Sequence, residues 1–329
     1  MTRRSIALLL ALLVAAATLV ACTDDGEPVL GPTTTVVPAT TASPQTGGEE
    51  ACGGIEPVAS YRPARPLQAP GTRLDGTMAA IQEHGRLRVG VSADTLLFGA
   101  RDPFTGRLEG FDIDVLREIA HAIFGGRIED IDQKIEFRVI NYAQRLPVLE
   151  DGQVDLVAHT MTINCTRWQR IAFSTEYYPA GQKLLVRTDS TVQSVDDLDG
   201  ERVCAAEGST NIENIAPYPV EIVGAPDLTD CLVLFQQGAV DAITGDDTVL
   251  AGFAEQDPYA KVVGLTFSAE PYGVGANAAQ VDLVQFVNSV LERMRTDGTW
   301  QAIANKHLGP LAPPSPPPAN YNRPIPAQQ

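Results

Sequence analysis

The sequence predicts an α/β protein made of two lobes with mostly parallel sheets. Stretches typical of strands alternate with stretches typical of helices over residues 76–308, which is the pattern of βαβ units. The alternation starts again at residue 184, so a second set of units follows the first. A chain of 329 residues is long enough for two domains or for one domain of two lobes.

The first set of elements is predicted from apolar periodicity. Residues 87–91 form a short apolar run typical of a buried strand, and residues 113–124 place their apolar side chains on one helical face. Residues 135–139 alternate as a strand does. A short helix at 146–150 and a strand at 154–158 complete this set.

The second set repeats these types of element. In order, we expect a strand at 184–186, a capped turn at 194–198, a strand at 202–205, a helix at 209–215, a helix at 231–237 and a strand at 240–244. An amphipathic helix at 281–294 and a shorter one ending at residue 307 follow. These last two lie too far along the chain to belong simply to the second lobe.

The first residues are typical of an exported protein. Two arginines precede the apolar run 6–17, which predicts a signal peptide over residues 1–21. Cys22 directly follows Leu-Val-Ala, and this arrangement resembles a lipobox, which implies cleavage before Cys22 and lipidation of its thiol. The alternative is an ordinary signal peptide with an incidental cysteine.

Two further segments differ in composition from the body. Residues 22–75 are rich in Thr, Pro, Gly and Ala and predict a flexible tether. Residues 310–329 are rich in proline and predict a solvated tail of polyproline II type. Whether this tail docks on the body is left open by the sequence.

The net charge excludes one class of partner. The chain has 24 Lys and Arg against 41 Asp and Glu, which gives a formal net charge of −17. Such an acidic chain repels phosphate backbones, so we expect no binding to nucleic acid.

Five cysteines predict two disulfides in an oxidising compartment. If Cys22 is lipidated, four remain, and four cysteines allow three connectivities. We favour Cys204–Cys231, which closes a loop within one lobe, and Cys52–Cys165, which joins the N-terminal segment to the body. No metal site or cofactor is expected, because the sequence has no C-x-x-C and no His near a Cys at ligand spacing.

Polar side chains follow the predicted strands, where α/β sheets bind ligands. Arginines and hydroxyls suit a carboxylate, the start of a helix adds positive potential, and a single aspartate suits an ammonium group. This set predicts a site for a zwitterion. The candidate residues are Phe98, Arg145, Thr160, Thr162, Arg167, Gly208, Ser209, Thr210 and Asp246.

Each candidate also has a structural alternative. Arg145 and Arg167 could be solvated surface residues, and residues 208–210 could simply cap a helix. Asp246 could cap the following helix, and Phe98 could belong to the core. Five turns that follow strands all carry side chains suited to one kind of ligand, and this favours the binding site over the structural alternatives.

Three segments carry a family resemblance. Residues 110–120 read GFDIDVLREIA, residues 162–178 contain the pattern T-I-x-x-x-R followed by F-S-x-x-Y-Y, and Asp241-Ala242 precede Asp246. Over residues 80–308 the chain resembles the family 3 extracellular solute-binding proteins, especially glutamine- and glutamate-binding lipoproteins of polar amino-acid ABC transporters.

The resemblance implies a two-lobed periplasmic-binding-protein type II fold. Two hinge strands would lie near residues 179–183 and 268–275. Lobe one would then comprise residues 76–180 and 275–309, and lobe two residues 181–274.

The resemblance also implies roles for the candidate residues. Arg167 and Thr162 would grip the α-carboxylate, Thr160 would contact the amine, and Asp246 would bind the ammonium group. Residues 208–210 would close on the ligand from lobe two. Arg145 precedes a P-x-L-x-x-G stretch, as in glutamate/aspartate-binding members, and favours ligands in the order Glu, Asp, Gln, Asn.

The function implied is that of a lipid-anchored, monomeric amino-acid-binding protein on the outer face of the cytoplasmic membrane, without enzymatic activity. It would deliver its ligand to an ABC permease or report it to a membrane sensor. One alternative is a dehydratase of prephenate-like acids, with Glu207 or Asp247 as acid or base. The other is a scaffold lipoprotein that binds no amino acid.

Overall fold

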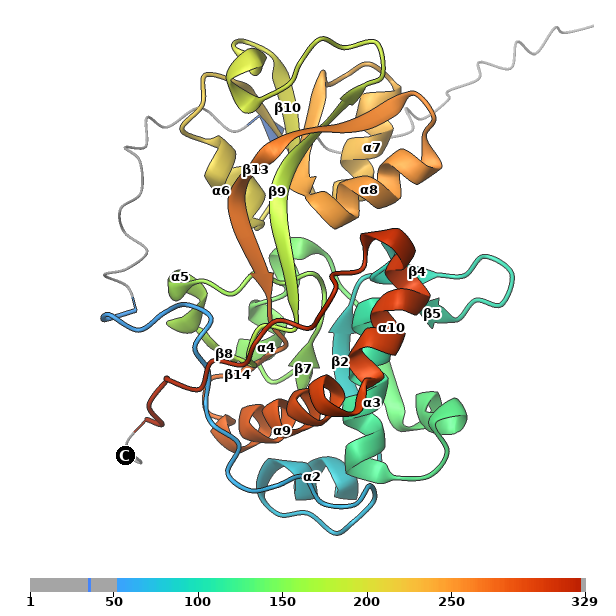
Figure 1. Cartoon of the computed structure of the whole chain (residues 1–329), viewed down its shortest axis with the longest axis vertical. Helices are drawn as coiled ribbons and strands as arrows, with labels where there is room; N and C mark the ends of the chain where they lie inside the picture. Colours follow the sequence, from blue (N-terminus) through green and yellow to red (C-terminus); the bar gives the residue numbers. More distant parts are fainter. Residues whose placement is uncertain (1–34, 37–51, 327–329) are drawn as a thin grey trace, which may run out of the picture. The chain divides into compact units, whose positions relative to one another are not determined.

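The structure is a computed structural model that describes residues 35–36 and 52–326. The expected signal peptide and Cys22 lie outside these residues. The structure contains two main sheets, each in its own lobe (Figure 1), as the sequence predicts. None of the helices within the described ranges is long and apolar enough to cross a membrane.

Lobe one is built on the five-stranded sheet β6-β2-β7-β14-β8. Its strands are β2 (Leu87–Val91), β6 (Ile135–Val139), β7 (Leu156–Val157), β8 (Ile171–Phe173) and β14 (Gly275–Asn277). A small sheet of β3 (Asp94–Thr95), β4 (Gly99–Arg101) and β5 (Leu108–Glu109) lies beside it. The helices are α2 (Gly76–His84), α3 (Phe111–Phe124), α4 (Pro147–Glu150), α5 (Cys165–Trp168), α9 (Val281–Asp297) and α10 (Thr299–Leu308), with 3₁₀ turns at Ile128–Lys134, Tyr142–Gln144 and Gly309–Leu311.

Lobe two is built on the six-stranded sheet β1-β11-β10-β12-β9-β13. Its strands are β1 (Thr35–Val36), β9 (Tyr178–Arg187), β10 (Arg202–Ala206), β11 (Glu221–Ala225), β12 (Ala242–Asp246) and β13 (Ala260–Tyr272). Its helices are α6 (Thr210–Ile215), α7 (Leu228–Gln236) and α8 (Asp247–Gln256), with a 3₁₀ turn at Val195–Leu198.

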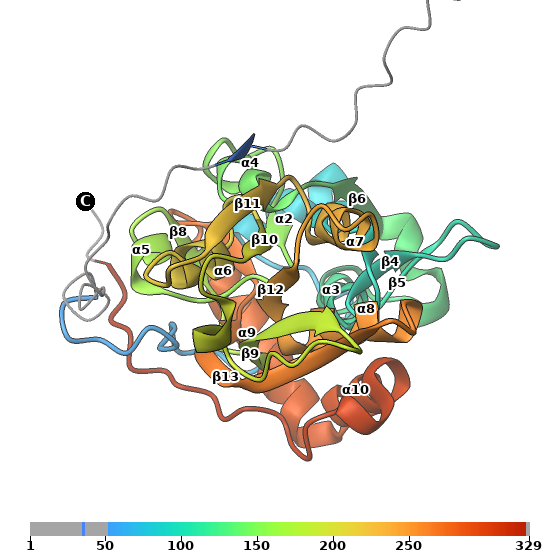
Figure 2. The same ribbon diagram turned by 90° about the horizontal axis from the view of Figure 1, so that it is seen from above.

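Successive side chains of a strand point to opposite faces of the sheet, so neighbouring residues in lobe two pack in separate cores. Val203 of β10 packs with Ile215 of α6, whereas Cys204 packs with Leu228 and Leu232 of α7. Helix α6 therefore covers one face of the sheet and α7 covers the other, an arrangement that can be followed in Figure 2. Parallel pairing of β10 with β11 and β12 brings their carboxyl ends to one edge.

Two long strands connect the lobes. β9 and β13 pair antiparallel along most of their length and run side by side between the sheets (Figures 1 and 2). Tyr178 pairs with Tyr272, and Gln182 pairs with Ser268. The hinge segments that the sequence predicts lie largely within these two strands. Both main sheets are mixed rather than mostly parallel, because β9 pairs antiparallel with β12 and β13 in lobe two and β14 pairs antiparallel with β7 and β8 in lobe one.

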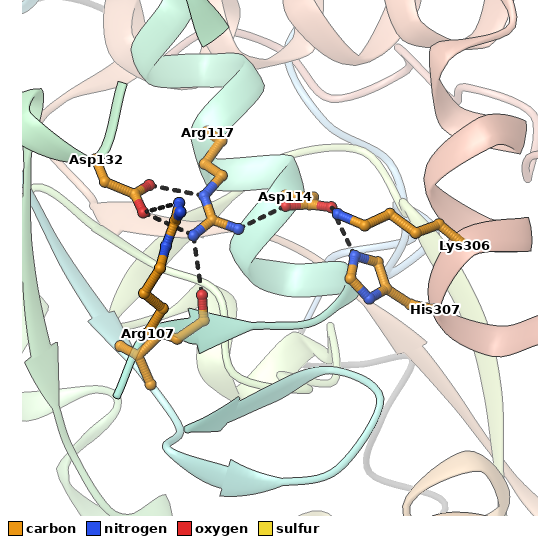
Figure 3. Close-up of polar contacts among 7 residues, drawn as sticks. Arg107, Asp114, Arg117, Asp132, Lys306 and His307 are labelled. Carbon is orange, nitrogen blue, oxygen red and sulfur yellow. Dashed lines mark hydrogen bonds and ion pairs between the residues drawn. The ribbon is translucent and has the colours of Figure 1, made fainter. Parts of the chain in front are cut away.

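The last two helices return to lobe one, where an ion-pair network holds α10 (Figure 3). Asp114 of α3 accepts hydrogen bonds from Lys306 at 2.7 Å and His307 at 2.6 Å. Arg117 of α3 donates to Asp114 at 2.7 Å and also to Asp132, which contacts Arg107 as well.

Residues 52–75 differ from the expected tether, because they pack against lobe one. Ser60 and Tyr61 are buried, and Asn288 of α9 donates from its amide to the Ser60 hydroxyl and the Tyr61 carbonyl. The Cys52–Cys165 disulfide fixes the start of this segment to α5. The other favoured pairing, Cys204–Cys231, is also present and joins β10 to α7.

The proline-rich tail also lies against the body. Arg295 of α9 donates to the Pro317 carbonyl at 3.0 Å, and the Ser60 amide donates to the Asn320 carbonyl at 2.9 Å. Arg323 donates to the Ala59 carbonyl at 2.8 Å. These contacts answer the question that the sequence left open, because they dock residues 317–323 on α9 and on the N-terminal segment.

Candidate ligand-binding site

The candidate residues lie where loops of the two lobes meet. Four of them belong to lobe one and come from the loops and the short helix α5 that follow its strands: Arg145, Thr160, Thr162 and Arg167. Four others belong to lobe two and come from the carboxyl ends of β10 and β12: Gly208, Ser209, Thr210 and Asp246. Hydrogen bonds link the two groups directly, so the structure has its lobes in contact at this place.

Arg145 is 1% exposed, so it is not the solvated surface residue of the alternative. Its Nε donates to the Tyr142 carbonyl, and its Nη1 donates to the carbonyls of His159 and Thr160. These bonds hold the side chain on lobe one. Its Nη2 donates to the Gly208 carbonyl of lobe two at 3.2 Å.

Arg167 is also buried, and it points to the same oxygen. Its Nη1 donates to the Thr162 carbonyl at 2.8 Å, and its Nη2 donates to the Gly208 carbonyl at 3.4 Å. Burial and the neighbouring charge of Arg145 lower the pKa of Arg167 to about 9. Two buried guanidinium groups thus share one uncharged acceptor, the Gly208 carbonyl, through long hydrogen bonds. An anion would give them stronger, charge-assisted hydrogen bonds.

Asp246 provides the opposite charge. It is 5% exposed and accepts hydrogen bonds from Asn211 Nδ2 at 2.8 Å and from the Tyr272 hydroxyl at 2.6 Å. Although it stands at the N-cap of α8, its side chain makes no capping hydrogen bond. Burial, reinforced by the charge of Glu270, raises the pKa of Asp246 above its usual range.

Glu270 is a residue that the sequence analysis missed. Its carboxylate accepts from the hydroxyls of Thr162 at 2.7 Å and Thr210 at 2.5 Å, and also from Asn214 and Ser268. The Thr162 hydroxyl therefore donates to the Glu270 side chain in this structure, whereas the resemblance implies that it grips the α-carboxylate of a ligand. Glu270 falls in the expected hinge segment, two positions before Tyr272, but nothing in the local sequence marks its contact with Thr162.

The loop at Thr160 has a strained backbone and is held in place by a buried aspartate. Thr160 has a φ of 42°, which is unusual for a β-branched residue and is the kind of strain that clusters at functional sites. Its amide donates to Asp112 at 2.8 Å, and Asp112 also accepts from the Tyr177 hydroxyl at 2.6 Å. Burial raises the pKa of Asp112 to about 6. The first aspartate of the GFDID segment thus supports the site.

Three other residues have structural roles here. Phe98 is fully buried among Phe111, Tyr178 and Tyr272, so its packing favours the alternative that it is a core residue. The Ser209 hydroxyl caps α6 by accepting from the Ile212 amide. His159 is buried, and burial followed by the charge of Arg145 lowers its pKa to about 3, so its ring is neutral.

Further contacts between the lobes surround the site. The Thr229 hydroxyl of α7 donates to Asp94 of β3 at 2.7 Å. Gly208 has a φ of 71°, and a Cβ there would lie 2.8 Å from the Ala143 Cα of the other lobe. Among the residues that the structure describes, no group of three or more His, Cys, Asp and Glu is placed to hold a metal ion.

Comparison with known proteins assigns this architecture to a family. Residues 87–310 match the family described as bacterial extracellular solute-binding proteins, family 3. The chain belongs to this family. Its fold is the two-lobed type II fold of periplasmic binding proteins, and members of the family bind solutes such as amino acids and work with ABC transporters.

The relatives are amino-acid-binding proteins. The chain is 34% identical over 235 residues to the ABC transporter glutamine-binding protein GlnH of Bacillus subtilis, which covers 70% of this chain and 84% of that protein. It is 33% identical to the glutamate-binding protein GluB of Corynebacterium glutamicum, covering 71% and 82% respectively. These relatives give no support to the dehydratase alternative.

A solved structure shows the same fold. An ancestral arginine-binding protein bound to glutamine superposes with a TM-score of 0.62 at 33% sequence identity. The match covers 68% of this chain and 98% of that one. The remaining part of this chain therefore has no counterpart there.

Proposed function

We propose that this protein binds an acidic amino acid, glutamate or aspartate, between its two lobes. The observation that carries the proposal is the convergence of Arg145 and Arg167 on the Gly208 carbonyl. Each guanidinium group is held on lobe one by other bonds, so its Nη2 is the atom directed toward lobe two. A ligand with two carboxylates would give each of them an anionic partner.

The charges at the site support the same ligand. Asp246 is buried with uncharged donors, so a ligand ammonium group would supply its missing cation. Arg167 would take the α-carboxylate and Arg145 the side-chain carboxylate. A side-chain amide would leave Arg145 with neutral acceptors, which places glutamine and asparagine after glutamate and aspartate. The glutamine- and glutamate-binding relatives are consistent with a ligand of this size.

We also propose where the protein works. Lipidation of Cys22 would anchor it, as a monomer, at the outer face of the cytoplasmic membrane. The relationship to GlnH, named as an ABC transporter protein, favours delivery of the ligand to an ABC permease over signalling to a membrane sensor. Loss of glutamate uptake in cells that lack the protein would support delivery.

Calorimetric titration of the purified protein tests the ligand. Carried-over ligand is first removed by partial unfolding and dialysis, and Glu, Asp, Gln, Asn and Arg are then compared. We expect Glu or Asp to bind most tightly. If no amino acid binds, the proposed function is wrong.

The variant Arg145→Ala tests the second arginine. Removing a charged partner of a buried carboxylate weakens binding by roughly 2–4 kcal/mol, so the preference for Glu over Gln should fall about thirtyfold or more. Gln binding should change much less, and a melting curve shows that the variant is folded. An unchanged ratio of Glu to Gln affinity would mean that Arg145 serves only to hold the loops.

A further inference from the structure

Two segments of the chain lie outside the residues that match the family. The match covers residues 87–310, whereas residues 52–62 and 317–323 lie before and after it. These two segments run together on lobe one, and we refer to them as the strap. The Ser60 amide donates to the Asn320 carbonyl, Asn320 donates to Glu56, and Arg323 donates to the Ala59 carbonyl.

The strap is attached firmly to the body of lobe one. The Ser60 hydroxyl donates to the Phe173 carbonyl of β8 at 2.6 Å, and Asn288 of α9 donates to Ser60 and to the Tyr61 carbonyl. Ala59 and Ser60 are fully buried. The strap therefore has a fixed position from which it can hold a neighbouring element.

That neighbouring element is α5. The Cys52–Cys165 disulfide joins the strap to the first residue of α5. Trp168, the last residue, donates from Nε1 to the Pro57 carbonyl at 2.8 Å. The Arg323 guanidinium lies 3.7 Å above the centre of the Trp168 ring, and the Tyr61 ring meets Trp168 edge-on at 5.8 Å.

Helix α5 needs such support because it has only four residues. A single helical turn is not stable by itself, so its orientation depends on contacts with its surroundings. Arg167 lies within this turn, directly before Trp168 and two residues after Cys165. The strap holds the residues on both sides of the arginine that reaches toward Gly208.

We propose that the strap positions α5 for ligand binding, with Arg323 and Trp168 as positioning residues for Arg167. This inference rests on the proposed function, in which Arg167 binds the α-carboxylate. The strap thus adds to the family fold a second layer of contacts behind the ligand site.

The test compares two arginines of the same strap. Arg323→Ala removes the cation above Trp168, whereas Arg62→Ala removes a similar cation above the Tyr321 ring, 5.3 Å from its centre. We expect Arg323→Ala to raise the dissociation constant for glutamate about three- to tenfold. Arg62→Ala should leave it within about twofold, and Arg323→Lys, which keeps the positive charge, should have an intermediate effect.

A double-mutant cycle shows whether the effect passes through Arg167. In an Arg167→Lys background, Arg323→Ala should cause little further loss of affinity, because the group it positions is already changed. Equal losses in both backgrounds, or a lower melting temperature for Arg323→Ala with unchanged affinity, would overturn the proposal.

Hydrogen exchange separates this proposal from the proposed function. Without ligand, the amides of residues 165–169 should exchange faster in Arg323→Ala than in the wild-type protein or in Arg62→Ala. If the wild-type protein binds no amino acid, the proposed function fails. Hydrogen exchange then tests the strap by itself. Unchanged exchange of the α5 amides in Arg323→Ala would reject the role of the strap.

Discussion

At the scale of a single residue, we expect Asp246 to couple ligand binding to pH. Burial and the charge of Glu270 raise its pKa in the empty protein, whereas a ligand ammonium group would favour the carboxylate and lower the pKa again. Binding at pH 6 should therefore release protons, and the affinity should fall as the pH is lowered from 8 to 5. The proton release should be smaller at pH 8, where Asp246 is more fully ionised.

Calorimetry in two buffers with different ionisation enthalpies measures this release. Asp246→Asn should bind at least about a hundredfold more weakly, because the ammonium group then lacks its charged partner. Asp189→Asn is a suitable control, since the Asp189 side chain is 81% exposed. Identical heats in the two buffers at pH 6 would contradict the role given to Asp246.

The same group affects the stability of the empty protein with a defined sign. Its pKa is higher in the folded than in the unfolded chain, so the folded state binds more protons between the two values. The contribution of Asp246 to stability is therefore fully present below the unfolded pKa of about 3.9 and is lost as the pH rises through the folded pKa. Asp246→Asn should remove this part of the pH dependence.

At the scale of elements, Asp114 joins α3 to α10. Burial by itself would raise the pKa of Asp114, but hydrogen bonds from His307, Lys306 and Arg117 outweigh it and hold the pKa below its usual range. A depressed pKa stabilises the folded state above the unfolded pKa, and this contribution is lost as the pH falls through the folded pKa.

Replacing Asp114 should therefore destabilise lobe one at neutral pH. We expect Asp114→Asn to lower the free energy of unfolding by roughly 3 kcal/mol at pH 7 and by less at pH 3, as measured by urea denaturation. Asp130→Asn is the matched control, because Asp130 pairs with Arg127 on the surface and such pairs contribute about 0–1 kcal/mol. Equal effects of the two substitutions would show that the network does not hold α10.

At the scale of the whole molecule, we expect closure around a ligand to depend on the close contact between the lobes at Gly208. A Cβ at this position would lie 2.8 Å from the Ala143 Cα of lobe one, and backbone atoms there have little freedom to move. Gly208→Ala should thus hinder closure and raise the dissociation constant about tenfold or more. Small-angle scattering should show a smaller decrease in radius of gyration on addition of ligand.

Gly200→Ala is the control for backbone strain. Gly200 has a φ of 76°, close to the 71° of Gly208, but a Cβ there would have no atom within 4 Å. Both variants should lose similar stability from the strained conformation, and only Gly208→Ala should lose affinity. Full affinity in Gly208→Ala would show that the ligand does not require this close approach.

The sequence by itself determined the family and several of the elements. Apolar periodicity predicts β2, β6 and α3 nearly at their observed bounds, because local side-chain patterns follow the geometry of strands and helices. The expectation that ligand-site loops follow the strands rests on a general property of α/β sheets. The structure does bring Arg145 and Arg167 to the same Gly208 carbonyl, and both arginines feel the charge of Asp246.

Only the tertiary structure decided how residues far apart in sequence share their hydrogen bonds. Glu270 carries no local signal of its contact with Thr162, which lies 108 positions earlier, and Phe98 gives no sign that three aromatic rings enclose it. Residues 52–62 have the composition of a tether, yet they are ordered by a disulfide, by α9 and by the tail. The composition of a segment indicates how much apolar surface the segment can bury by itself. Whether the segment is ordered depends on the surface that the rest of the chain offers to it.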